Sequence, residues 1–161
     1  MAKKENKTNA MRILETMKIE YEMRTYECDE FIDGIHIADQ LGMPYENVYK
    51  TLVTVGKSKN HYVFVIPVAE EIDFKKAARV VGEKALEMLP LKDLTAVTGY
   101  IRGGCTSIGM KKKFKTVIQE DEMLYEKVVV SGGRVGLQLI VSPEDLLKAA
   151  TAEFADVIVC K

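Results

Sequence analysis

The sequence predicts an α+β fold in a single domain that spans residues 1–161. The chain is long enough to bury one core, and its 47% hydrophobic and 29% charged residues are ordinary for a globular domain. Helix-like and strand-like segments are interspersed, and several strand-like segments are separated only by short polar turns. Hairpins of this kind predict a mixed or mostly antiparallel sheet with helices packed around it.

Caps, breakers and apolar periodicity divide the first half of the chain. A Thr, Asn or Asp before an apolar stretch predicts a helix start, Gly predicts its end, and alternation predicts a strand. The first expected element is a helix capped by Thr8 or Asn9, with Met11, Ile13, Leu14 and Met17 on its apolar face, followed by a half-buried strand at 21–26. A short helix that carries Ile35, Ile37, Ala38 and Leu41 is expected to end at Gly42. Strands are expected at 48–55 and 61–68, and a further helix at 74–81 between Asp73 and Gly82.

The second half is expected to hold more strands than helices. Ser142, Pro143 and Asp145 together form a clear helix start, because serine caps the first turn, proline needs no N–H there, and the carboxylate favours the positive end. The other expected elements are a short helix at 91–98, strands at 115–119, 126–131 and 136–141, and a last apolar run at 156–159.

Charge and composition exclude several classes of protein. The formal net charge is −1, so no global field draws the chain to nucleic acid or to an anionic membrane. No apolar run reaches the length of a membrane span, and the polar start at 1–9 is unlike a secretory signal, so we expect a cytoplasmic protein. Two histidines and three cysteines without metal-ligand spacing predict no metal site and no cofactor; these are His36, His61, Cys28, Cys105 and Cys160.

Two glycine-rich stretches are candidates for a ligand site. The stretch at 98–109 contains four glycines and runs into Lys111, Lys112, Lys113 and Lys115, while Ser131 precedes the pair Gly132-Gly133. Glycine loops expose backbone N–H groups that can face a carbonyl or acidic group. The second pair is equally consistent with a tight hairpin turn, and the lysines with a solvated face or a local RNA-backbone patch.

Several single residues allow both a functional and a structural interpretation. Lys50 interrupts a strand onset, where a lysine usually points to water but can place its ammonium over a pocket. Cys105 lies in the glycine loop and is either a nucleophile or, as we favour, a packing residue. Ser131 is a pocket hydroxyl or a turn residue, and Tyr26 fits a core aromatic on pattern alone.

An ordered set of segments resembles a known family. Val48-Tyr49-Lys50-Thr51-Leu52, Thr98-Gly99-Tyr100 with Gly103-Gly104, Val130-Ser131-Gly132-Gly133 and Gly136-Leu137 are similar to the YbaK/EbsC family of free-standing Cys-tRNA(Pro) deacylases. That family is related to the editing domain inserted in bacterial prolyl-tRNA synthetases. The resemblance covers nearly the whole chain and implies one domain with a mixed, barrel-like sheet.

The resemblance also implies residue roles. Lys50 would be the essential lysine with Thr51 and Tyr26 beside it, and the backbone of Gly103 and Gly104 would contact the substrate. Ser131 with Gly132 would line the pocket. Gln138 stands where close relatives have an acidic residue, and Thr106-Ser107 stands where they often have Ser-Pro; these are the two departures from the family pattern.

The activity implied is trans-editing of aminoacyl-tRNA at its 3′ end. Cysteine would be cleared from Cys-tRNA(Pro), and also from Cys-tRNA(Cys), through attack of the substrate's own thiol on its ester carbonyl. Such a route needs orientation of the substrate and stabilisation of developing charge more than it needs a protein nucleophile. The resemblance also implies prolyl-tRNA synthetase as a partner. Two alternatives stay open: an acyl hydrolase that uses Cys105, and a non-catalytic module that binds tRNA ends or a synthetase.

Overall fold

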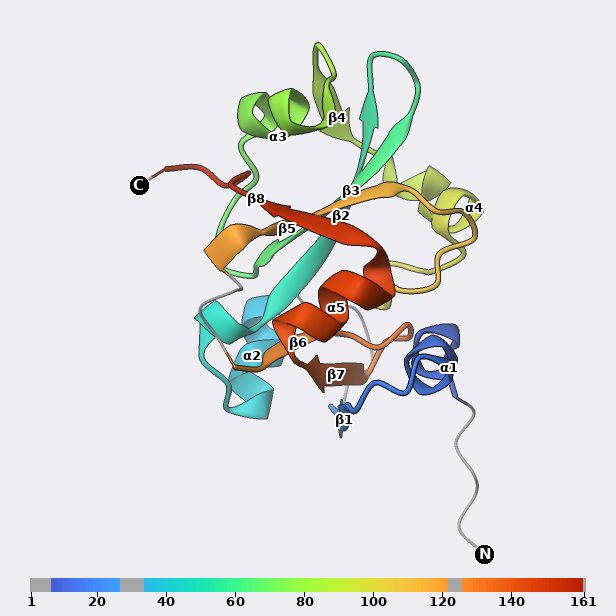
Figure 1. The fold of residues 1–161 in the computed structure, drawn as a ribbon. Helices are drawn as coiled ribbons and strands as arrows, with labels where there is room; N and C mark the ends of the chain where they lie inside the picture. Colours follow the sequence, from blue (N-terminus) through green and yellow to red (C-terminus); the bar gives the residue numbers. More distant parts are fainter. Residues whose placement is uncertain (1–6, 27–33, 122–125, 161) are drawn as a thin grey trace, which may run out of the picture.

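The computed structural model describes residues 7–26, 34–121 and 126–160, which form an α+β fold with two sheets (Figure 1). The α+β class of the prediction is confirmed. The described elements are α1 (Asn9–Thr16), β1 (Glu22–Thr25), α2 (Gly34–Leu41), the 3₁₀ turn η1 (Tyr45–Asn47), β2 (Tyr49–Gly56), β3 (His61–Pro67), α3 (Phe74–Val81), β4 (Leu86–Met88), the 3₁₀ turn η2 (Leu91–Asp93), α4 (Leu94–Thr98), β5 (Lys115–Gln119), β6 (Val128–Ser131), β7 (Leu137–Val141), α5 (Pro143–Ala150) and β8 (Ala152–Ala155).

The larger sheet has the strand order β4-β2-β3-β5-β8, and the smaller has the order β1-β7-β6. Four strand pairings are antiparallel, and two, β3 with β5 and β5 with β8, are parallel. An isolated parallel bridge between Val48 and Val129 joins the sheets at one point. Within the described residues the pairings do not close into a barrel, so the barrel-like part of the prediction is not confirmed.

Helix boundaries follow the predicted capping residues closely. The Thr8 side chain accepts from the Met11 N–H, Asp73 accepts from two N–H groups of α3, and Ser142 accepts from the Asp145 N–H. Gly82 ends α3 in the left-handed conformation that glycine adopts without strain. Local side-chain chemistry therefore sets these helix ends.

The main core lies between the two sheets and is completed by α1 and α5 (Figure 1). A second cluster packs α3 on the other face of the larger sheet, and a third packs α2 beside Val48 and Val129. Two burial expectations are wrong. All four residues of β1 are exposed, because β1 is an edge strand, and Met17 is exposed because α1 ends one residue before it.

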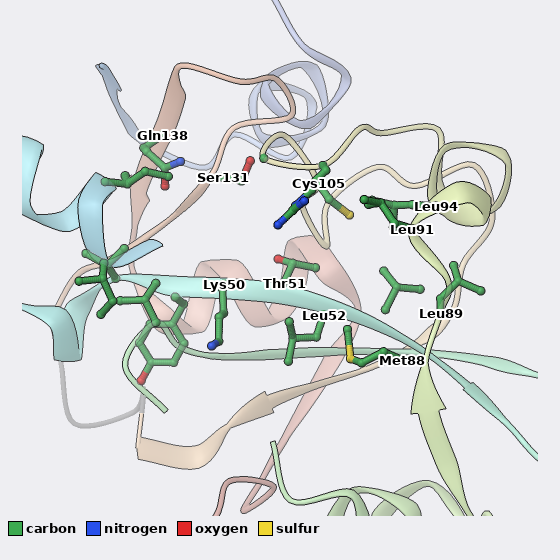
Figure 2. Close-up of a pocket in the computed structure, with 18 residues that line it drawn as sticks. Lys50, Thr51, Leu52, Met88, Leu89, Leu91, Leu94, Cys105, Ser131 and Gln138 are labelled. Carbon is green, nitrogen blue, oxygen red and sulfur yellow. The ribbon is translucent and has the colours of Figure 1, made fainter. Parts of the chain in front are cut away.

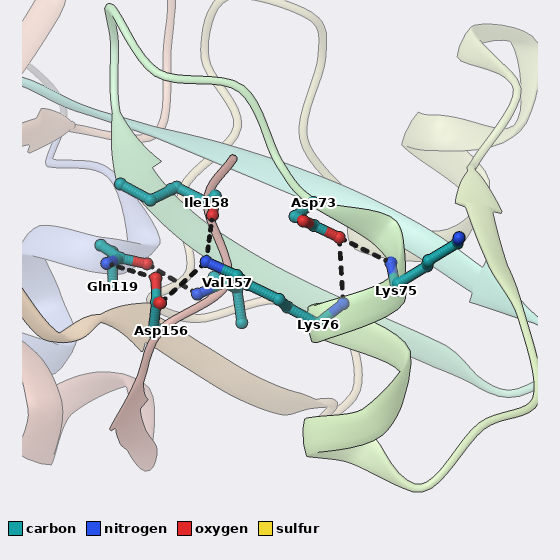
Figure 3. Close-up of polar contacts among 7 residues, drawn as sticks. All are labelled: Asp73, Lys75, Lys76, Gln119, Asp156, Val157 and Ile158. Carbon is teal, nitrogen blue, oxygen red and sulfur yellow. Dashed lines mark hydrogen bonds and ion pairs between the residues drawn. The ribbon is translucent and has the colours of Figure 1, made fainter. Parts of the chain in front are cut away.

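The segment after β8 is held by a small polar network (Figure 3). The Gln119 carboxamide oxygen accepts from the Val157 N–H at 2.8 Å, and its nitrogen donates to Asp156 at 3.1 Å. Lys76 donates to the Asp156 carboxylate and to the Ile158 carbonyl, both at 2.9 Å. The expected last apolar run at 156–159 directly follows β8, and its Ile158 forms an isolated antiparallel bridge with Ile72.

Replacing Gln119 with leucine is expected to lower the free energy of unfolding by about 1–3 kcal/mol, because the Val157 N–H would lose its partner in a buried place. Urea denaturation measures the change. Asp156→Asn is the control, because its half-exposed ion pair with Lys76 is expected to contribute less than about 1 kcal/mol. An equal loss in both variants would contradict a special role for the buried amide.

Candidate functional site

A cavity of about 690 Å³ lies between β2, the loop after α4, and the adjoining strands β6 and β7 (Figure 2). Its polar wall consists of Lys50, Thr51, Arg102, Gly103, Cys105, Ser131 and Gln138. Residues from four segments far apart in the sequence thus meet at one place. The prediction that the two glycine-rich stretches belong to a common site agrees with this arrangement.

The two glycine loops contact each other through their backbones. A Cβ on Gly104 would lie 2.7 Å from the Cα of Arg134, which is closer than real Cβ contacts allow. Gly103 adopts a φ of 85° and Gly133 a φ of 103°, which other residues rarely adopt. Glycine is therefore required here for close approach and for chain direction.

The first loop is fixed by hydrogen bonds at its base. The Tyr100 hydroxyl donates to the Ile108 carbonyl at 2.6 Å, and the Thr98 hydroxyl accepts from the Tyr100 N–H at 3.0 Å. Burial raises the pKa of Tyr100 to about 12, so the phenol stays protonated and remains a donor at neutral pH. Burial likewise raises the pKa of Cys105 to about 11, which leaves it a thiol at neutral pH.

Ser131 and Gln138 are opposite one another on the antiparallel strands β6 and β7. Gln138 is only 3% exposed, and Figure 2 shows its carboxamide on the same side of the cavity as Ser131. Both side chains line the cavity, where the carboxamide and the hydroxyl can each donate or accept a hydrogen bond to a ligand.

Lys50 and Thr51 are neighbours on β2 and leave opposite faces of the strand. Thr51 is paired with Val65, and Figure 2 shows its side chain directed toward Ser131 and Cys105. Lys50 is paired with Ile66, and in the same view its side chain leaves the other face of β2. On the edge of β2 that faces away from β3, β4 pairs only with the last three residues, Thr54 to Gly56. The first part of this edge borders the cavity, so residues from both faces of β2 line it.

Five predicted site residues line the cavity, and three do not. Lys50, Thr51, Gly103, Ser131 and Gln138 line it, whereas Gly104 and Gly132 lie next to lining residues. Tyr26 is buried outside the wall, and its N–H donates to the Gly136 carbonyl at 3.0 Å. A Cβ on Gly132 would meet the Leu137 side chain at 2.6 Å, so this glycine serves close packing.

Sequence reasoning missed Arg102 and one apolar wall of the cavity. Arg102 stands directly before Gly103, so its place in the glycine loop was the available signal. The apolar wall comprises Leu52, Met88, Leu89, Leu91 and Leu94. Nothing in the local sequence marks these residues as pocket residues, because β4 and the start of α4 reach the cavity only through tertiary packing.

The lysine run is only partly available to a ligand. The Lys111 ammonium donates to the Ala96 carbonyl at 3.4 Å, and Lys115 forms an ion pair with Glu153 at 3.6 Å. Lys112 and Lys113 are exposed. A basic patch here would therefore consist mainly of these last two side chains, beside the end of α4.

Neither a metal cluster nor a membrane span is found in the part of the chain that the structure describes. No three His, Cys, Asp or Glu side chains in these ranges are grouped so that they could hold a metal ion. No helix there combines the length and the hydropathy that crossing a bilayer requires. Cys28 lies outside the described residues.

Comparison with known proteins assigns the family. Residues 35–149 match the sequence pattern of the aminoacyl-tRNA editing domain. The chain is 44% identical, over 98% of each chain, to an Enterococcus faecalis protein named as a candidate Cys-tRNA(Pro)/Cys-tRNA(Cys) deacylase, EbsC.

Solved structures show the same fold. A candidate trans-editing enzyme for prolyl-tRNA synthetase superposes with a TM-score of 0.81 at 23% identity, over 97% of this chain and 100% of that one. The hypothetical protein APE2540 superposes with a TM-score of 0.84 at 21% identity, over 92% of this chain and 97% of that one. By its sequence match and its close relative, this chain belongs to the aminoacyl-tRNA editing domain family.

Proposed function

We propose that this protein is a cytoplasmic trans-editing deacylase that removes cysteine from Cys-tRNA(Pro) and also acts on Cys-tRNA(Cys). The observation that carries the proposal is the cavity lined by Lys50, Gly103, Ser131 and Gln138, in a chain 44% identical to a relative with that name. A complex with prolyl-tRNA synthetase is part of the proposal, because the related structure is named for that synthetase.

The proposed reaction uses the thiol of the substrate. Its sulfur attacks the ester carbonyl carbon, a C–S bond forms, the C–O bond to the ribose breaks, and the thiol proton ends on the ribose oxygen. The products are tRNA with a free hydroxyl and a cyclic cysteine thiolactone. The protein has to hold the thiol near the carbonyl and to stabilise negative charge on the carbonyl oxygen.

The cavity offers groups for both tasks. Lys50 and Arg102 bring positive charge to the wall, and the backbone of Gly103 lines it directly. Lys50 would anchor the terminal phosphate or the carbonyl, and the loop amides would face the developing oxyanion. Gln138 and Ser131 would orient the ester through neutral hydrogen bonds.

The state of Cys105 argues against the alternative hydrolase. A nucleophilic cysteine needs a thiolate and hence a lowered pKa, whereas burial raises the pKa of Cys105 to about 11. In the described chain its side chain lines the cavity without a histidine among the other lining residues. Packing against the substrate is therefore the role we assign to it.

Cys105→Ala is expected to retain most of the wild-type rate of cysteine release from Cys-tRNA(Pro), because the thiol of the substrate does the chemistry. The measurement follows loss of the labelled ester with wild type, with the variant and without protein. An inactive folded variant, or an acyl group trapped on Cys105, would support the hydrolase instead. Wild-type release equal to the protein-free background would leave only a binding module.

A further inference from the structure

The cavity has two ends that differ in exposure. Toward α2 it is closed by buried side chains, among them Ile37, Val48 and Val68. The opposite end is formed by Met88, Leu89, Leu91 and Leu94, which we call the apolar rim. Met88 is 44% and Leu91 56% exposed, so this end is open to solvent. Figure 2 shows the rim on one side of the cavity and Lys50 and Gln138 on the other.

A cysteinyl group alone is too small to explain this cavity. Its 690 Å³ lie within the range of about 300–1,000 Å³ that is typical of sites for much larger molecules. An aminoacyl ester is attached to the ribose of the terminal adenosine, so a bound ester carries a base only a few bonds from its carbonyl. The space beyond the polar wall is large enough to receive that nucleoside.

Resting on the proposed function, we propose that the apolar rim binds the adenine of this terminal adenosine, with the aminoacyl group directed inward toward α2. A polynucleotide has to leave through the open end, and the rim is that end. The flat faces of a base suit aliphatic side chains, while its polar edge can remain in water at an exposed rim.

The position of the lysine run supports the same direction. The Lys111 N–H donates to the Thr98 carbonyl at 3.0 Å, and its ammonium reaches the Ala96 carbonyl, so this segment lies against α4. Leu94 of the rim begins that helix. The exposed Lys112 and Lys113 follow directly after this contact with α4, and the phosphates of a departing strand would need such cations.

The test compares two substrates that differ in the base. Cysteinyl-adenosine carries adenine, and cysteine ethyl ester does not. For the double variant Met88→Ala/Leu91→Ala we expect kcat/KM for cysteinyl-adenosine to fall roughly tenfold, mainly through KM, because two apolar contacts to the base are lost. With the ethyl ester the change should stay below about twofold.

The matched control is Met17→Ala/Met23→Ala. Both methionines are 43% exposed and neither lines the cavity, so this variant should deacylate both substrates as wild type does. Equal losses for both substrates in the rim variant, or a changed amino-acid preference, would overturn the assignment and place the aminoacyl group at the rim. Wild type that leaves Cys-tRNA(Pro) intact would instead refute the proposed function.

A binding measurement keeps the inference testable without turnover. On addition of 5′-AMP, the methyl NMR signal of Met88 is expected to shift, while those of Met17 and Met23 stay in place. Adenosine without phosphate should produce the same shift at higher concentration. An unmoved Met88 signal under saturating AMP would overturn the proposal.

Discussion

Lys50→Ala is expected to fold normally and to lose deacylation of Cys-tRNA(Pro) by roughly 10²-fold or more. Lys50 stands on the cavity wall at the open edge of β2, where an ammonium can act on a phosphate or on the ester carbonyl. Removing one preorganised charge contact from a transition state costs about this factor. Single-turnover rates of ester loss, measured beside a thermal denaturation curve, give the two quantities needed.

Two further lysine variants distinguish the effect of losing a charge at the cavity from the effect of losing a positive charge elsewhere on the protein. Lys57→Ala removes an exposed lysine from the turn between β2 and β3 and should leave the rate unchanged. Lys50→Arg keeps the charge but changes the donor geometry, so part of the activity should return. Turnover near that of wild type in a folded Lys50→Ala protein would remove Lys50 from the mechanism.

The second large effect is expected from Gly104→Ala. The added Cβ would lie 2.7 Å from the Cα and 2.8 Å from the carbonyl carbon of Arg134, so the two glycine loops would have to separate. Gly103, which lines the cavity, would move with them. Since a displacement of about 1 Å in a positioning group can cost 10²-fold in rate, we expect a loss of that order in kcat/KM.

Gly82→Ala controls for strain without a change at the site. Gly82 has a φ of 79° at the end of α3, and a Cβ there meets nothing within 4 Å. Its substitution should lower the stability by about 1–2 kcal/mol while the deacylation rate at 25 °C stays at the wild-type level. A Gly104→Ala protein as active as this control would show that the contact between the loops does not matter for catalysis.

The elements that the sequence predicted well are those fixed by local chemistry. The caps at Thr8, Asp73 and Ser142 place their helices, and the turn after β2 forms the expected hairpin. β4 and β8 were missed because each is short and exists only through pairing with a distant strand. The exposure of β1 likewise follows from its edge position, which no local pattern encodes.

The site was predictable where its residues sit in glycine loops or in the Tyr49-Lys50-Thr51 segment. A glycine in the sequence indicates a backbone position that other residues would not fit. In the structure Gly103 has a positive φ, and Gly104 lies close to the backbone of Arg134. The apolar rim could not be predicted, because Met88 and Leu91 look like ordinary hydrophobic residues until the fold brings them to the cavity.

The most direct test of the account compares deacylation of Cys-tRNA(Pro) and Ser-tRNA(Pro) by the wild-type protein. The two substrates differ only in the side-chain group of the amino acid, which is a thiol in cysteine and a hydroxyl in serine. A hydroxyl is a far weaker nucleophile than a thiol near neutral pH. We expect the cysteinyl ester to be lost at least about 10²-fold faster than the seryl ester, each rate being corrected for its protein-free background. Equal rates for both esters would contradict the use of the substrate thiol and, with it, the proposed function.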